Sequence, residues 1–359
     1  MKTNNYLFKT IMLFSFAVLF FGAAASARAD VSSCGDFAGI EMRRVTYYEN
    51  LSPVPSDLRA SFVNDRLIVR LRGWLYYPSG KKLKNKKVII FNHGHADARP
   101  EPCGLARYFV REGYVFFAPL RRGHYASEPR NPPSGWQSIT STGIFTDDYA
   151  NNCVLTGNCS CNTCSAPAPT TCNYNRYEVN YIYRQVEDVR EQTRFIRNHD
   201  AIDSDGSPLT GKLADAAHIA ILGHSYGGSL ITFANAQLEL QNVAISVSGA
   251  ELSWGSDEPA WETELSCAME SQNRPIYFLQ PKNGLTLAPM KKLFGIAVDK
   301  KYRSQAAIFP ATAWDPDAED PEAKQAHENF IGDSVEIQRW GPTVKEFIGR
   351  YPREVLNPN

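Results

Sequence analysis

The sequence has no excess of charge of either sign. Among 359 residues, 38 lysines and arginines balance 38 aspartates and glutamates, so the formal net charge is zero. No long basic run stands out, and nucleic acid is therefore not expected as a partner. Charged residues make up 21% and hydrophobic residues 43% of the chain, which excludes a disordered chain and a coiled coil. We find no internal repeat.

The sequence also lacks an apolar run long enough for a comfortable membrane span. The run near the N-terminus, Ile11–Phe21, is too short. Two lysines precede it, and small residues ending in an A-x-A pattern at 27–29 follow it. This order predicts a secretory signal peptide over residues 1–29, with an uncleaved anchor as the alternative. We therefore expect an exported protein, secreted or periplasmic, whose mature chain 30–359 has no stable membrane span.

All eight cysteines follow the predicted cleavage site, and five of them fall within Cys153–Cys172. An even number of cysteines in an exported chain favours disulfide bonds. Cys161 and Cys164 have the spacing of zinc ligands, but no second C-x-x-C and no nearby histidine complete a zinc set. We expect disulfides, although spacing does not reveal their pairing, and we expect no metal and no other cofactor.

Short apolar runs alternate along the chain with stretches of helical periodicity. An early strand or hairpin is predicted at 66–78. Further strands are predicted at 88–91, 114–118, 218–222, 243–247, 275–279 and 306–309, and helices at 103–113, 178–198, 226–240 and 342–350. This alternation predicts one α/β domain with a mostly parallel sheet and helices on both faces. The segment at about 124–177 is too long for an ordinary connection. We interpret it as a cysteine-rich insertion.

The sharpest chemical signal is Gly223-His224-Ser225-Tyr226-Gly227, a G-x-S-x-G pattern between a predicted strand and a predicted helix. Its glycines allow a tight turn that lifts Ser225 above the sheet edge as a nucleophile. The backbone N–H of Tyr226 is then available to a developing oxyanion. A glycine-rich packing turn is the alternative interpretation.

A serine nucleophile needs a base, and histidine is the usual one. Six of the seven histidines lie at or before the G-x-S-x-G pattern, and only His327 follows Ser225. In hydrolases with this type of turn the order along the chain is serine, acid, histidine. His327 is therefore the candidate base by elimination. The alternative is a surface histidine in a polar loop.

A second polar turn follows the predicted strand at 88–91, where the sequence reads Asn92-His93-Gly94-His95. A His-Gly pair here makes the N–H of His95 the second candidate donor to an oxyanion, although a plain strand-ending turn is possible. Two histidines could suggest a metal, but nothing else clusters with them.

Arg121 and Arg122 follow the next predicted strand. They could clamp a substrate carboxylate, but we favour a role in tying loops together.

These motifs resemble α/β-hydrolases of the dienelactone-hydrolase-like, prolyl-oligopeptidase-related group. The matching stretches are FNHGH at 91–95, APLRRGH at 118–124, ILGHSYGG at 221–228, PIYFLQPKNGLTLAP at 275–289, AHENF at 326–330 and RWGPTVKEFI at 339–348. The resemblance implies the α/β-hydrolase fold and a serine hydrolase. The cysteine block is not part of the pattern.

The sequence departs from this group at the acid of the triad. Similar proteins carry Asn-Asp where this chain has Asn283-Gly284, and glycine has no carboxylate to orient the histidine. We favour Glu251, in the loop after the preceding strand, as the replacement. Asn283 could instead act as a neutral acceptor, or another carboxylate such as Asp257 or Asp315 could serve. The site could also lack an acid, leaving a protein that only binds ligands.

Together these observations predict an exported serine hydrolase that cleaves a small-molecule ester, of the carboxylesterase or lactone-hydrolase type. Ser225 forms an acyl-enzyme and His327 acts as base. A non-catalytic binding protein on the same scaffold and a serine peptidase are the alternatives. We see no propeller-sized N-terminal region that would gate peptides, so esters are favoured. The oligomeric state is not indicated.

Overall fold

The computed structural model describes residues 37–51, 67–94, 102–121, 176–239, 241–250, 259–272, 274–309 and 321–352. The chain divides into two compact units, Met1–Ala38 and Gly39–Asn359, and the helices and strands given below belong to the second. The predicted signal peptide over residues 1–29 lies outside the described residues and stays a prediction.

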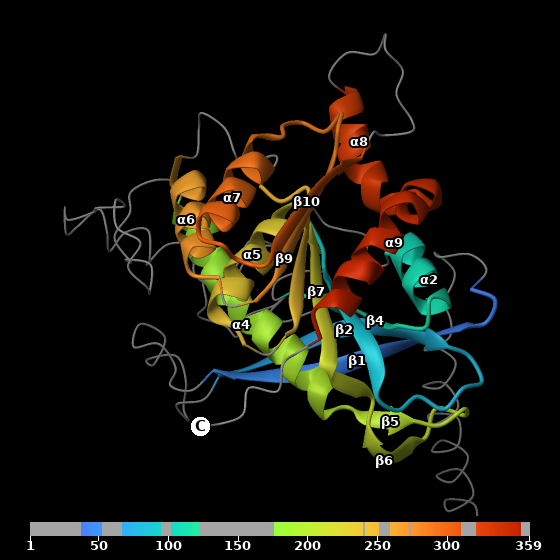
Figure 1. The fold of residues 1–359 in the computed structure, drawn as a ribbon. Helices are drawn as coiled ribbons and strands as arrows, with labels where there is room; N and C mark the ends of the chain where they lie inside the picture. Colours follow the sequence, from blue (N-terminus) through green and yellow to red (C-terminus); the bar gives the residue numbers. More distant parts are fainter. Residues whose placement is uncertain are drawn as a thin grey trace, which may run out of the picture. The chain divides into compact units, whose positions relative to one another are not determined.

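The elements follow one another as strands interrupted by helices (Figure 1). The strands are β1 (Ile40–Leu51), β2 (Leu67–Pro78), β3 (Lys86–Asn92), β4 (Val115–Leu120), β5 (Asp200–Ile202), β6 (Pro208–Lys212), β7 (Ala214–His224), β8 (Val243–Val247), β9 (Ile276–Pro281) and β10 (Ser304–Phe309). The helices are α2 (Cys103–Arg111), α4 (Arg176–Asn198), α5 (Tyr226–Gln237), α6 (Pro259–Glu270), α7 (Ala288–Asp299), α8 (Pro321–Gly332) and α9 (Ser334–Arg350).

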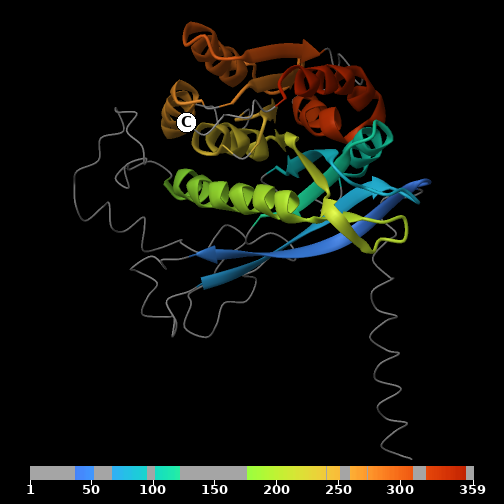
Figure 2. The same ribbon diagram turned by 60° about the horizontal axis from the view of Figure 1, so that its bottom comes forward.

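Eight strands form one sheet in the order β1-β2-β4-β3-β7-β8-β9-β10. Strand β2 runs antiparallel to both of its neighbours, while every pair from β4 to β10 is parallel. Strands β5 and β6 form a separate two-stranded sheet. Helices α4, α5, α6 and α7 cover one face of the large sheet, and α2, α8 and α9 cover the other (Figures 1 and 2). The prediction of a mostly parallel sheet between two helical layers is confirmed.

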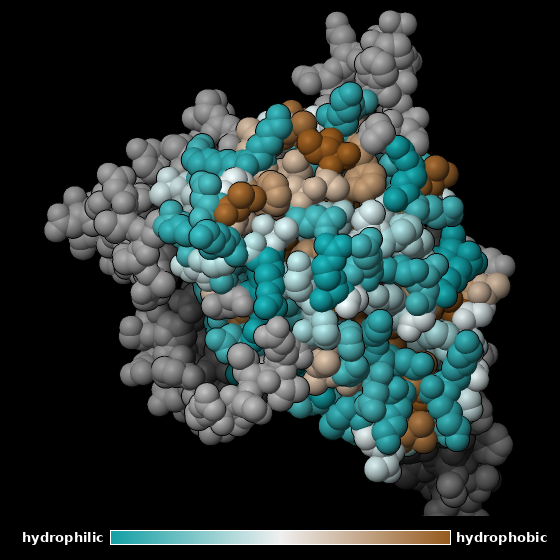
Figure 3. Space-filling model, in the orientation of Figure 1, coloured by the Kyte–Doolittle hydropathy of each residue, from teal (hydrophilic) through white to brown (hydrophobic). Residues whose placement is uncertain are grey.

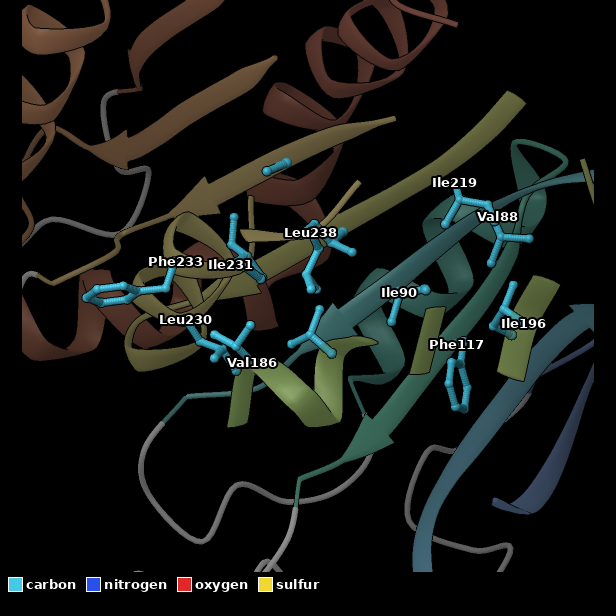
Figure 4. Close-up of a cluster of buried hydrophobic side chains, with 14 of the residues drawn as sticks. Val88, Ile90, Phe117, Val186, Ile196, Ile219, Leu230, Ile231, Phe233 and Leu238 are labelled. Carbon is cyan, nitrogen blue, oxygen red and sulfur yellow. The ribbon is translucent and has the colours of Figure 1, made fainter. Parts of the chain in front are cut away.

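Alternate residues of β3 face the two helical layers, as the two-residue period of a strand requires. Val88 and Ile90 belong to the larger apolar cluster, which they share with Val186 of α4 and with Leu230 and Ile231 of α5 (Figure 4). All five side chains are fully buried. This cluster fixes the helix that follows the G-x-S-x-G turn against the middle of the sheet.

Aromatic rings fill the opposite face. Phe91 of β3 stacks on Phe116 of β4 at 6.0 Å between ring centroids, and Phe109 of α2 stacks on the same ring at 6.2 Å. Trp340 of α9 lies 6.2 Å from Phe109 and donates its Nε1–H to the carbonyl of Phe330 in α8 at 2.8 Å. The layer that carries α8, and with it His327, is therefore anchored to a rigid aromatic core.

The last helix is longer than the sequence suggested. The predicted helix began at Pro342. Helix α9 begins instead at Ser334, where the Asp333 side chain accepts the N–H of Val335 at 2.7 Å as an N-cap. Pro342 lies within the helix. Strands β1, β5 and β6 and helices α6, α7 and α8 were also absent from the prediction.

The predicted insertion at about 124–177 falls almost wholly outside the described residues, since only its last two positions belong to α4. The cysteines of 153–172 lie there too, so their oxidation stays a prediction. Two cysteines elsewhere, Cys103 at the start of α2 and Cys267 in α6, take part in disulfide bonds.

The face of the molecule in Figure 3 is largely hydrophilic, with hydrophobic areas gathered over β10 and its neighbouring helices. Strand β10 is the last strand in the sheet order, and its Ile308 is 43% exposed. Among the described residues no helix is long and apolar enough to cross a membrane.

Candidate active site

Ser225 occupies a sharp turn between β7 and α5. Its backbone has φ 56° and ψ −123°, a conformation that residues with a side chain rarely adopt. Gly228 and Ser229 donate their N–H groups to the Ser225 carbonyl at 2.8 and 3.2 Å, so the helix begins directly behind the serine. The residue is 7% exposed. This is the strained strand-turn-helix geometry that the G-x-S-x-G pattern predicts.

The glycines of the turn are required by close backbone contacts. A Cβ on Gly227 would lie 2.1 Å from the carbonyl oxygen of Asn92 and 2.5 Å from that of His93. A Cβ on Gly223 would lie 2.0 Å from the carbonyl oxygen of Gly227. Only glycine allows α5 to start this close to the end of β3. The alternative of a plain packing turn does not explain the positive φ of Ser225.

The turn lies where the sheet changes its winding direction. After β3 the chain continues to β4 on one side, and after β7 it continues to β8 on the other. In open α/β sheets ligands bind at such a switch point, outside the carboxyl ends of the strands. Here the end of β3 meets the serine, because a Cβ on Gly94 would lie 3.5 Å from the Cβ of Ser225.

His327 lies beside the same turn. It belongs to α8 and its side chain is fully buried, so the alternative of a surface histidine in a polar loop is wrong. Its carbonyl oxygen lies 3.0 Å from Nε2 of His224, and the two imidazole rings are 4.5 Å apart between centroids. The candidate base therefore packs against His224, the residue that directly precedes the candidate nucleophile.

His224 is a neutral imidazole in this setting. A carbonyl oxygen can only accept, so the hydrogen bond to His327 requires a proton on Nε2 of His224. Complete burial lowers the pKa of His224 well below its ordinary value, and the nearby His327 lowers this pKa further. The hydrogen bond to the His327 carbonyl opposes both effects without overcoming them.

Arg121, at the end of β4, ties the elements of the site together. Its guanidinium is fully buried and donates to the carbonyl oxygens of His93 and Gly94 at 2.5 and 2.8 Å. It also lies 5.3 Å from the ring centroid of Tyr226, a cation–π contact. These contacts agree with the expectation that Arg121 ties loops rather than clamps a substrate. Arg122 lies outside the described residues.

Of the two candidate oxyanion donors, the structure describes one. Tyr226 is the first residue of α5, where backbone N–H groups have no partner within the helix and the helix dipole favours negative charge. His95 lies outside the described residues, so its role stays a prediction. His93 is described and buried, and its Nδ1 lies 2.9 Å from the Gly94 carbonyl.

The candidates for the acid's position are Glu251, which we favour, and the alternatives Asp257, Asp315 and Asn283. Glu251, Asp257 and Asp315 all lie outside the described residues. Asn283 and Gly284 occupy a turn after β9 in which the Gly284 N–H donates to the Pro281 carbonyl at 3.2 Å. The role of Asn283 as a neutral acceptor stays a prediction.

Sequence reasoning missed two contributions to this site. It treated His224 as a variable position of the motif and did not connect it with His327, which is 103 residues away. It favoured a loop-tying role for Arg121 but did not identify the carbonyls of His93 and Gly94 as its partners, because periodicity does not show which carbonyls a buried arginine reaches. Both contacts depend on tertiary packing, and we find no local signal for them.

Among the described residues, no group of three histidine, cysteine, aspartate or glutamate side chains is arranged to hold a metal.

Comparisons with known proteins agree with this architecture. No family model and no curated protein matches the chain. An acylaminoacyl peptidase in complex with Z-Gly-Gly-Phe-chloromethyl ketone is 15% identical with a TM-score of 0.50, covering 89% of this chain and 43% of that one. Acylaminoacyl peptidase from Pyrococcus horikoshii is 14% identical, with the same TM-score and coverage.

A third similar structure is the α/β hydrolase GrgF from Penicillium sp. sh18, 12% identical with a TM-score of 0.48, covering 87% of this chain and all of that one. The chain spans less than half the length of the two peptidases. At these identities the likeness concerns the fold. Together with the sheet order and the turn at Ser225, it shows that the chain has the α/β-hydrolase fold.

Proposed function

We propose that this protein is a serine hydrolase that cleaves a small ester through an acyl-enzyme on Ser225. The observation that carries the proposal is the strained backbone of Ser225 at the switch point of the sheet, with the buried His327 beside it. A strained, non-glycine residue is kept only where the surrounding structure enforces it, and such residues cluster at active sites. Hydrolases among the structural neighbours support the reaction class.

In the proposed reaction, Ser225 Oγ attacks the ester carbonyl carbon while its proton passes to the imidazole of His327. The C=O electron pair moves to the oxygen, which accepts hydrogen bonds from the N–H groups of Tyr226 and His95. The intermediate collapses and expels the alcohol, which takes the proton from His327. In the second half, water gives a proton to His327 as its oxygen attacks the acyl carbon. The second intermediate then breaks its bond to Ser225, releasing the acid, and Ser225 Oγ takes the proton back from His327. Glu251 orients His327 and stabilises its imidazolium.

The test is active-site labelling of the full chain. A fluorophosphonate probe should add one adduct by intact mass, and peptide mapping should locate the adduct on Ser225. Ser225→Ala should remain unlabelled. Absence of labelling in folded protein, with a known serine hydrolase labelled in the same experiment, would refute the proposal. The same result would favour the binding-only alternative, for which Gly284 in place of the usual aspartate is the supporting observation.

The leaving group is tested separately, because two of the similar structures are acylaminoacyl peptidases and support the peptide alternative. Short-chain acyl nitrophenyl esters and N-acyl-peptide nitroanilides should be compared at equal concentration. We expect turnover of the esters, abolished by Ser225→Ala, and little turnover of the anilides. The opposite ranking would assign a peptidase.

We also propose that the protein is exported. The support is the order of charged, apolar and small residues over 1–29. N-terminal sequencing of the mature protein should begin at Asp30, and the protein should be recovered outside the cytoplasm. A retained Met1 on active protein would contradict cleavage.

A further inference from the structure

We propose that His224 is a positioning residue that holds the base His327 against the nucleophile turn, an inference that rests on the proposed function. Its imidazole is 2% exposed, and its Nε2–H donates to the His327 carbonyl at 3.0 Å. The two rings lie 4.5 Å apart at an angle of 43°. The same residue is covalently joined to Ser225. A single side chain therefore connects the two groups that exchange a proton.

The two ends of this connection belong to different layers of the fold. His224 ends β7, whose last residues pair with β3 on one side and with β8 on the other, so its backbone is held by the centre of the sheet. His327 lies on α8, which is tied to α9 through the hydrogen bond from Trp340 to the Phe330 carbonyl. That bond fixes α8 within the helical layer but not relative to the serine. The bond from His224 supplies the link to the strand that carries Ser225.

The chemistry of the imidazole suits this position. His327 must become positively charged when it takes the proton of Ser225. A second cation at the short distance of His224 would oppose that charge, and a neutral ring does not. The neutral ring still offers one N–H donor of fixed direction. The Nδ1 of His224 faces Gly94, since a Cβ built on Gly94 would lie 3.8 Å from this nitrogen.

The alignment of nucleophile and base is sensitive to small displacements, and an error of about 1 Å can cost about 100-fold in rate. We therefore expect His224→Met, which removes the donor, to lower kcat on nitrophenyl esters by about 10- to 100-fold with little change in KM. Glutamine has nearly the shape of methionine and places an N–H donor near the former Nε2. His224→Gln should keep kcat within about fivefold of the wild type.

A matched control is available on the same strand. His218 lies in the first half of β7, and its Nδ1 pairs with Asp215 at 2.6 Å. Six residues of extended strand, about 20 Å, separate it from His224. His218→Met should leave kcat unchanged. Thermal melting of all three variants checks that they are folded, and His224→Leu replaces His224→Met if the latter unfolds.

The outcomes separate this inference from the proposed function. Wild-type protein that the fluorophosphonate does not label refutes the function, and with it the inference. Labelled, active wild type together with unchanged kcat in His224→Met overturns only the inference. Equal losses of kcat in His224→Gln and His224→Met also overturn it. If the ring only filled space, glutamine, which keeps an N–H donor, and methionine, which does not, would have the same effect.

Discussion

Gly94 and Ser225 face each other across the switch point of the sheet, and a methyl group on Gly94 would meet the Cβ of Ser225 at 3.5 Å. That distance is an ordinary van der Waals contact. The turn after β3 therefore lies against the nucleophile but leaves space for one small group. By contrast, Gly227 has no such space, because its Cβ would overlap the Asn92 carbonyl oxygen at 2.1 Å.

Gly94→Ala should consequently affect activity, whereas Gly227→Ala should affect stability. Gly94→Ala should fold with nearly unchanged stability, while its methyl group beside Ser225 slows acylation. Gly227→Ala should lower the free energy of unfolding by about 3 kcal/mol or more, because backbone must move to relieve the overlap. Gly295→Ala, on α7 with open space around its Cβ, should instead stabilise by about 0.5–1 kcal/mol. Denaturant unfolding of the three variants tests this, and equal stability of the first two would contradict it.

Ser225→Gly should stabilise the protein while abolishing its activity. The φ of 56° and ψ of −123° are costly for serine and easy for glycine, so we expect a gain of about 1–3 kcal/mol in the free energy of unfolding. Ser225→Ala also loses the nucleophile but keeps a Cβ in the same strained conformation, and it should gain little. Melting temperatures of the two variants check the difference. If alanine stabilises as much as glycine, the strain is not at this residue.

The fold was predictable from the sequence because its central strands are continuous apolar runs. Residues 243–247 were predicted as a strand and form β8, and Tyr226 was predicted as the first residue of the helix after the turn. Strand β1 was missed because its residues 40–51 form neither a continuous apolar run nor a regular alternation, since Arg43 and Arg44 are adjacent. At this edge of the sheet, pairing with β2 decides the conformation. Helix α8 was missed because its sequence is mostly polar and only the burial of residues such as Phe330 reveals its inner face.

The site was predictable only where the chemistry is local. The turn at Ser225 is encoded by two glycines within five residues, and its geometry is as predicted. The selection of His327 depended on chain order, and the structure places it at the turn, although on a helix rather than in a loop. The hydrogen bonds of His224 and Arg121 join segments far apart in the sequence. Such contacts require the folded chain.

The stability of the protein should fall as the pH drops below about 6.5. The pKa of His224 is lower in the folded state than its ordinary value of 6.5, so between these two values the unfolded chain binds more protons than the folded one. The stabilisation that comes from His224 is fully present above the pKa of the unfolded state and is lost as the pH falls toward the pKa of the folded state. Over this range the free energy of unfolding changes by at most about 1.4 kcal/mol per pH unit. His224→Gln should lose this part of the slope. Parallel curves for urea unfolding between pH 8 and 5 would contradict the prediction.

Arg121→Met should reduce turnover more than substrate binding. The change removes both donors to the His93 and Gly94 carbonyls. Because the C=O and N–H of a trans peptide point in opposite directions, loosening the Gly94 carbonyl also loosens the N–H that we assign to the oxyanion. Loss of one such donor costs about 10²–10³ in kcat, and we expect a loss of about 10- to 100-fold. Arg121→Lys should not rescue it, since an ammonium lacks the fork that reaches two carbonyls.

The control for this prediction is Arg43→Met. Arg43 of β1 also donates to a backbone carbonyl, that of Gly206, at 2.8 Å, but in a turn between β5 and β6. Arg43→Met should leave kcat unchanged. If the Arg121 and Arg43 variants lose activity equally at equal melting temperature, the loss at Arg121 does not come from the oxyanion site.

Glu251→Gln and Gly284→Asp together decide which residue acts as the acid. If Glu251 orients His327, Glu251→Gln keeps the shape of the side chain but removes the charge that stabilises the imidazolium. In serine proteases the corresponding Asp→Asn change lowers kcat by about 10⁴. We expect a loss of about 10²–10⁴, equivalent to about 3–5 kcal/mol of transition-state stabilisation.

Gly284→Asp restores a carboxylate at the position where similar hydrolases carry one. Gly284 lies in a turn in which its N–H donates to the Pro281 carbonyl. With Glu251 in place, Gly284→Asp should add little, because a second negative charge near the first is unfavourable. In Glu251→Gln, by contrast, it should recover part of the lost kcat. If Gly284→Asp raises the activity of the wild type and Glu251→Gln changes nothing, the native site lacks an acid and the assignment of Glu251 is wrong.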